Sequence, residues 1–175
     1  DLHSTSRRQR QMCIRDSSIV NKNNKRIAVI NLIGRTSMGI LSENPFIVAN
    51  DIYNKLKNQA DIFVLDFHAE ATAEKIAMGY YMDGKYTIVY GTHTHVQTAD
   101  EQMLEKGTAY ITDIGMTGPK KSVIGMDVGV SFKRFVTSLP ERYKLADSEA
   151  MINGCVFKIN DETNRTEEII RINTK

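Results

Sequence analysis

The sequence lacks the features that mark several specialised classes of protein. No apolar run reaches about 18 residues, so no membrane-spanning segment is predicted. Cysteine occurs only twice, as Cys13 and Cys155, which argues against a disulfide framework and fits a cytoplasmic protein. The 23 basic and 21 acidic residues nearly balance, so neither a membrane partner nor a stable nucleic-acid complex is expected.

What remains is the composition of one globular domain. The chain has 175 residues, of which 41% are hydrophobic and 25% are charged, and this is enough to bury a core. Cys155 lies in an apolar run and is predicted to be a buried small hydrophobic side chain. Composition leaves self-association into a homo-oligomer open.

The first residues differ from the rest of the chain. Residues 1–17 hold four arginines among glutamine and serine and have no apolar periodicity. Such a segment buries too little surface to offset the entropy lost on ordering. We interpret it as a non-native or disordered leader that resembles a translated sequencing adapter, in preference to a basic arm for nucleic acid. His3 and Cys13 are therefore excluded from any site, and residues 18–175 are expected to be the C-terminal part of a single domain.

Strand-like and helix-like patterns alternate after the leader. Near-continuous β-branched and apolar runs are typical of buried strands, and apolar residues at helical spacing indicate helices. The predicted strands are 26–33, 61–67, 86–90 and 108–112, and the predicted helices are 46–59, 69–79 and 128–139.

The last part of the chain has a different pattern. Residues 142–146, 150–159 and 168–172 alternate between apolar and polar side chains, which predicts an antiparallel meander or hairpin with one wet face. Strand–helix alternation followed by antiparallel strands favours an α/β layered sandwich.

Three histidines directly follow predicted strands. His68 follows the strand 61–67, and His93 and His95 follow the strand 86–90. Ligand sites in open α/β sheets lie beyond the carboxyl ends of the strands. If the backbone stays extended from His93 to His95, their imidazoles point to the same side and converge on one centre. Imidazole suits zinc, iron, nickel and copper and, less well, manganese, so these residues are candidate metal ligands.

Neighbouring residues leave other interpretations open. Asp66 or Glu70 could hydrogen-bond an imidazole, but a structural or capping role is favoured for both. Gly91 is expected to let the chain bend at the strand end. Three imidazoles alone could hold one catalytic metal, as in a mononuclear hydrolase. The histidines could also be incidental, in a non-catalytic α/β interaction domain.

Longer blocks carry a family resemblance. Residues 66–72 read D-F-H-A-E-A-T and residues 91–100 read G-T-H-T-H-V-Q-T-A-D, and residues 107–119 continue in register. These blocks resemble those of the YmdB-like metallophosphoesterases, in the calcineurin-like superfamily. The resemblance implies a calcineurin-like α/β/β/α sandwich with two divalent metal ions, iron or manganese or also zinc. It further implies hydrolysis of phosphodiesters, with 2′,3′-cyclic nucleotides as the expected substrate class.

Roles follow from the resemblance residue by residue. His68 and His93 would bind one metal ion and His95 the other. Thr92 and Thr94 could orient ligands or donate to phosphate oxygens of the substrate. The turn from Gly115 to Gly118 is expected near the substrate phosphate, and a plain structural role is the alternative for each of these residues.

The sequence departs from the family at its N-terminal side. The family's G-D-x-x-G, N-G-E-N and G-N-H blocks, which supply the bridging carboxylate, further ligands and the proton-donating histidine, do not occur in this sequence. No catalytic residue is therefore retained. We expect a domain truncated at its N-terminal side, with an exposed strand edge and no hydrolytic activity on its own.

Overall fold

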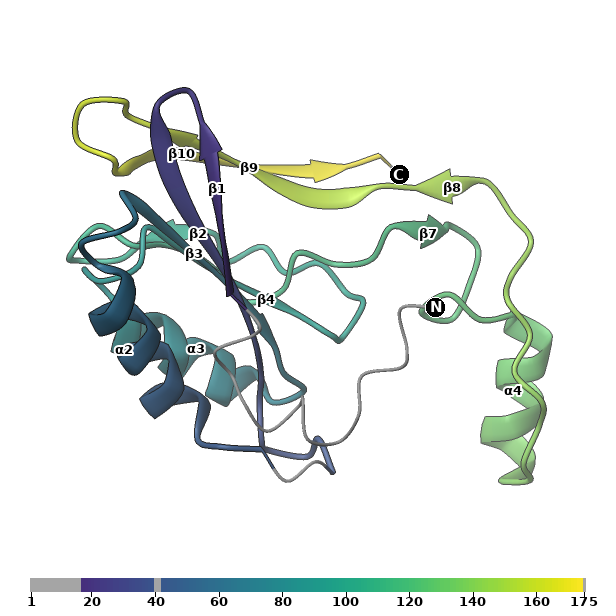
Figure 1. Ribbon diagram of the computed structural model, residues 1–175. Coiled ribbons are helices and arrows are strands. Elements are labelled where there is room, and N and C mark those ends of the chain that lie inside the picture. Colours follow the sequence, from purple (N-terminus) through teal and green to yellow (C-terminus); the bar gives the residue numbers. More distant parts are fainter. Residues whose placement is uncertain (1–16, 40–41, 175) are drawn as a thin grey trace.

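The computed structural model describes residues 17–39 and 42–174 of the chain (Figure 1). Most of the predicted leader therefore lies outside the described residues. Ser17, its last residue, begins a strand, β1 (Ser17–Lys22), that sequence patterning missed. β1 returns through Asn23 and Asn24, which both have a positive φ, as two-residue hairpin turns require.

A mostly parallel sheet is the centre of the fold. Six strands of the described chain pair in the order β1-β2-β3-β4-β6-β5. The four inner strands run parallel, and β1 and β5 pair antiparallel at the two edges. The strands after β1 are β2 (Lys25–Ile33), β3 (Ile62–His68), β4 (Ile88–Thr92), β5 (Gln102–Met103) and β6 (Ala109–Ile111). The predicted α/β class is confirmed.

Two helices cover one face of this sheet (Figure 1). These are α2 (Pro45–Leu56) and α3 (Thr72–Met82). Proline at the first position and the Asn44 side chain, which accepts from the amide of Phe46, start α2. The side chains of alternate strand residues such as Ile30, Leu65 and Val89 pack beneath the helices in the core. Their neighbours along each strand point to the opposite face.

A hairpin of two strands lies over part of that opposite face. It consists of β9 (Asn153–Ile159) and β10 (Thr166–Asn173), which pair antiparallel. Phe157 stacks on Tyr90 of β4, with ring centroids 6.4 Å apart. The predicted antiparallel tail is thus confirmed for 150–159 and 168–172. It is wrong for 142–146, where Leu145 makes only an isolated bridge to Met126, because an alternating pattern forms a strand only where a partner strand is available.

The remaining elements lie beside this layered part. They are β7 (Gly118–Pro119), β8 (Ala150–Met151) and α4 (Val128–Thr137). Figure 1 shows α4 away from α2 and α3, and Ser131 is its buried residue. α4 was expected over 128–139 but ends earlier, at the cap residue Ser138, which is in the left-handed conformation. The helices in the described ranges are all too short or too polar to cross a membrane.

The start of α3 differs from the prediction. The helix was expected over 69–79 but begins at Thr72 and continues through Gly79. A Cβ at Gly79 would lie 2.5 Å from the ring of Tyr110, so glycine lets the helix approach β6 closely. Residues 69–71 instead carry the chain away from the end of β3, where the candidate site lies.

Candidate metal centre

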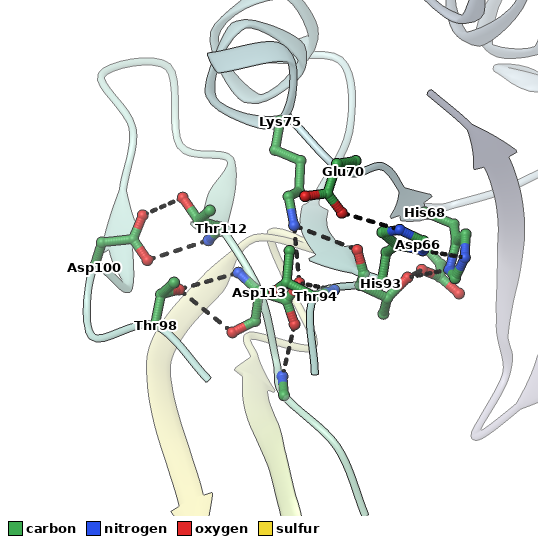
Figure 2. Close-up of polar contacts among 12 residues, drawn as sticks. Asp66, His68, Glu70, Lys75, His93, Thr94, Thr98, Asp100, Thr112 and Asp113 are labelled. Atoms are coloured by element: carbon green, nitrogen blue, oxygen red, sulfur yellow. Dashed lines mark hydrogen bonds and ion pairs between the residues drawn. The ribbon is translucent and has the colours of Figure 1, made fainter. Parts of the chain in front are cut away.

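Two of the three predicted histidines meet at the carboxyl ends of β3 and β4. The strands pair in parallel with His68 opposite Thr92, so His93 follows beside His68. Nδ1 of His93 lies 3.0 Å from Nε2 of His68, and the rings are edge to face with centroids 4.7 Å apart (Figure 2). The expectation that neighbouring strand ends bring these imidazoles together is confirmed.

A chain of hydrogen bonds orients His68. Thr92 donates its hydroxyl proton to Oδ1 of Asp66 at 2.8 Å, and Asn31 donates its amide to the other oxygen of that carboxylate. Because this proton of Thr92 is used, its oxygen must accept from Nδ1 of His68, 3.2 Å away. Nε2 of His68 then keeps its lone pair, as a metal ligand requires. Burial lowers the pKa of His68, and the neighbouring His93 lowers it further, which also favours the neutral ring.

A carboxylate contacts the second imidazole. Oε2 of Glu70 lies 3.0 Å from Nε2 of His93 (Figure 2). Glu70 thus makes the imidazole contact that the sequence left as the less favoured alternative. Asp66 bonds to Thr92 and Asn31 and to no imidazole in the described chain, in keeping with the structural role favoured for it.

The third histidine, His95, contacts a backbone carbonyl instead of an imidazole. The extended backbone expected from His93 to His95 is not formed, because the two residues have φ values of 104° and 67°. Non-glycine residues in this region cost on the order of 1–3 kcal/mol each. Nδ1 of His95 lies 3.0 Å from the carbonyl oxygen of Ile124. A carbonyl only accepts, so Nδ1 donates and Nε2 of His95 also keeps its lone pair.

Thr94, between these two strained residues, is held by a carboxylate. Its amide and its hydroxyl lie 3.2 and 2.7 Å from Oδ2 of Asp113. Nζ of Lys75 lies 2.8 Å from the same oxygen, and both charged side chains are only 1% exposed (Figure 2). Since the hydroxyl proton of Thr94 is used by Asp113, the donation to substrate expected of Thr94 needs a rearrangement of this contact.

Gly91 makes room for this ion pair. A Cβ at Gly91 would lie 1.8 Å from the carbonyl oxygen of Thr112 and 2.5 Å from Cδ of Lys75. Its φ is not positive, so close approach explains the glycine better than the expected bend does. Sequence reasoning missed Lys75 and Asn31. For Lys75 a signal was present, because it shares the buried side of α3 with Met78, Gly79 and Met82 at helical spacing.

Two further residues singled out from the sequence belong to other strands. Gly118 is in β7 and pairs with Met151 of β8. Cys155, expected to be buried, is partly buried and is a free thiol in the described part of the chain. Burial raises the pKa of this thiol to about 11, so it stays protonated and unreactive.

The separation of the two ring nitrogens matches that of two ligands on one metal ion. Two nitrogens bound to one ion at about 2.0–2.1 Å lie about 3 Å apart when their bonds meet at a right angle or somewhat wider. Nδ1 of His93 and Nε2 of His68 have a separation of 3.0 Å. Within residues 17–39 and 42–174, however, no group of three or more histidine, cysteine or acidic side chains is gathered as a metal site. Bound metal would have to replace the hydrogen bond between the rings.

An α/β protein with histidines gathered beyond the carboxyl ends of adjacent parallel strands is the class that the fold and site define. Within that class the chain belongs to the YmdB-like protein family, whose model matches residues 10–172.

Relatives of this chain include an enzyme and two solved structures. A 2′,3′-cyclic-nucleotide 2′-phosphodiesterase of Bacillus subtilis (strain 168) is 48% identical over 153 residues, covering 87% of this chain and 58% of that protein. The crystal structure of a novel phosphatase from Mycoplasma pneumoniae has a TM-score of 0.81 and 38% identity, over 90% of this chain and 57% of that one. A hypothetical protein from Thermus thermophilus has the same TM-score of 0.81 at 33% identity, over 90% of this chain and 61% of that one. The chain thus spans a little over half of the length of these relatives.

Proposed function

We propose that this chain is the C-terminal part of a two-metal phosphodiesterase that hydrolyses 2′,3′-cyclic nucleotides or related phosphodiesters. The observation that carries the proposal is the contact between His68 and His93, in which Nε2 of His68 is unprotonated and could bind a metal ion in place of its hydrogen bond with His93. The similarity to the Bacillus subtilis enzyme supports the substrate class. A cytoplasmic location belongs to the same proposal, and self-association remains open.

Each histidine has a role in this proposal. His68 and His93 hold one metal ion and His95 the other, with iron or manganese as the expected metals and zinc as a third. Bound metals supply Lewis-acid chemistry, because they polarise the phosphate and lower the pKa of a bound water. The chain's own groups prepare the ligands: Thr92 fixes the tautomer of His68, and the carbonyl of Ile124 fixes that of His95.

We also propose that the chain alone has no hydrolytic activity. Three neutral imidazoles do not supply the negative charge that two adjacent divalent cations need, and Asp66 and Asp113 are already engaged by neutral or cationic donors. Glu70 lies on His93, but one carboxylate beside one imidazole does not complete two coordination spheres.

The test compares the chain with an extended form. The N-terminal part of the Bacillus subtilis relative, joined to this chain, is expected to give manganese- or iron-dependent hydrolysis of 2′,3′-cyclic AMP that His93→Ala abolishes. The chain alone is expected to give none. A folded chimera without turnover would contradict the phosphodiesterase assignment. Turnover by the chain alone, lost in His93→Ala, would instead favour the mononuclear hydrolase.

A further inference from the structure

Lys75 and Asp113 form a buried ion pair whose polar contacts converge on the histidine-bearing loop. Each side chain is 1% exposed, and Nζ lies 2.8 Å from Oδ2. Such a pair is a weak source of stability, since well-packed apolar side chains of the same volume often serve as well. Stability alone therefore does not explain why this ion pair is buried here, and we look for its role in the segments that it contacts.

The loop that the pair contacts is strained at two places. His93 and His95 both have a left-handed backbone, with φ of 104° and 67°, and Thr94 lies between them. Strained residues keep such conformations only when the surrounding contacts over-determine them.

The ion pair supplies several of those contacts at once. Lys75 donates to the carbonyl of Thr92 at 3.3 Å, just before the strained segment. Asp113 accepts from the amide and the hydroxyl of Thr94, at its centre, and its other oxygen accepts from the amide of Gly115. The loop is thereby fixed relative to α3 on one side and to the segment after β6 on the other (Figure 2).

We propose that Lys75 and Asp113, acting through Thr94, are positioning residues that hold His93 and His95 in the orientation in which they bind metal. The inference rests on the proposed function, because it requires these histidines to be metal ligands. The carboxylate of Asp113 is not itself a ligand in this account. Its two oxygens already accept from Lys75, Thr94 and Gly115, and through these bonds it links the loop to the rigid core.

Thr94→Val tests the inference, because it keeps the shape of the side chain and removes the hydroxyl that Asp113 binds. Co²⁺ is a suitable probe, since imidazole sites bind it more tightly than Mn²⁺. We expect the dissociation constant for Co²⁺ to rise about 10–100-fold in Thr94→Val, the usual effect of losing a group that orients a ligand. Thr94→Ser, which restores the hydroxyl, should stay within about threefold of the wild-type constant.

Thr87→Val is the matched control. It removes a threonine hydroxyl at the opposite end of β4, where Thr87 accepts from the amide of Phe63. Both valine variants should lower the urea midpoint of the metal-free protein, but only Thr94→Val should weaken Co²⁺ binding. Equal Co²⁺ affinity in wild type and Thr94→Val would overturn the inference. If Thr94→Val fails to fold, Thr94→Ala removes the same hydroxyl without the extra methyl group and is read in the same way.

His93→Ala distinguishes a failure of the positioning role from a failure of the metal assignment. If the wild type binds Co²⁺, His93→Ala does not, and Thr94→Val binds like the wild type, the positioning role is wrong and the proposed function stands. If the wild type and His93→Ala bind Co²⁺ equally or not at all, the metal assignment fails and the inference fails with it.

Discussion

Gly91→Ala should be among the most damaging single substitutions in the chain. The added Cβ would lie 1.8 Å from the carbonyl oxygen of Thr112 and 2.5 Å from Cδ of Lys75, where real Cβ atoms essentially never come within 3.0 Å. The oxygen belongs to the backbone just after β6, which pairs with β4, so it has no side-chain freedom to move away. The methyl group must therefore force the two segments apart or expel Lys75 from its place.

The loss in the free energy of unfolding can be estimated for each of these outcomes. Forcing extra volume into a packed core costs about 1–3 kcal/mol. Breaking the buried contact between Lys75 and Asp113 costs about 3–5 kcal/mol, because it leaves a charge without its partner. We therefore expect a loss of at least about 1 kcal/mol, and of about 3–5 kcal/mol if Lys75 is expelled, against the roughly 5–15 kcal/mol typical of a domain.

Urea unfolding followed by circular dichroism measures the effect, with Gly154→Ala as the matched control. A Cβ at Gly154 meets nothing within 4 Å, and its φ is not positive, so this variant should stay within about 0.5 kcal/mol of the wild type. If Gly91→Ala is destabilised by less than about 1 kcal/mol, the close approach described for Gly91 does not exist in solution.

Three further predictions concern the rest of the fold. Hydrogen bonds from the side chain and then the backbone of Arg26 lower the pKa of Asp61 from 3.8 to about 2, so the pair stabilises the fold above about pH 4 and the effect is lost as pH falls through about 2. The difference in urea midpoint between wild type and Asp61→Asn should therefore shrink from pH 6 to pH 2, and a constant difference would contradict this. Tyr86→Phe should lose about 0.5–1.5 kcal/mol in urea unfolding, because the buried hydroxyl of Tyr86 donates to the carbonyl of Ala49 at 2.8 Å. Asp127→Ala should destabilise α4 by about 1 kcal/mol in amide hydrogen exchange, because the Asp127 side chain caps the helix; unchanged exchange across α4 would refute this.

Local patterning predicted the part of the molecule that presents the histidines. The strands before His68 and His93 are buried apolar runs, and their order with the intervening helix requires parallel neighbours. The predicted start of one strand was two residues too early, since β4 begins at Ile88 rather than at Tyr86. Tyr86 belongs to the turn after α3, where its amide bonds to the carbonyl of Met82.

Elements whose structure depends on partners far away in the sequence were harder to predict. β1 has a polar, short sequence next to the atypical leader, and only the asparagine pair at 23–24 signalled its hairpin. Residues 142–146 have the alternation of a strand but no partner strand to pair with in the described chain. Register and pairing are properties of the assembled sheet, so a pattern within one segment does not determine them.

The backbone conformation of residues 93–95 could not be predicted from local sequence patterns. An extended backbone is the default after a strand, whereas His93 and His95 adopt left-handed conformations that histidine seldom takes. The loop is contacted by Asp113, about twenty residues further along the chain, and Asp113 in turn pairs with Lys75 from α3. A lysine on the apolar side of a helix was the one visible sign that a buried acid had to be near.

Anomalous diffraction from crystals of this chain soaked in Co²⁺ tests the metal assignment most directly. We predict a cobalt peak bonded to ring nitrogens of both His68 and His93, with the present 3.0 Å hydrogen bond between the rings replaced by two metal bonds. A map in which cobalt binds elsewhere, while that hydrogen bond persists, would contradict the account.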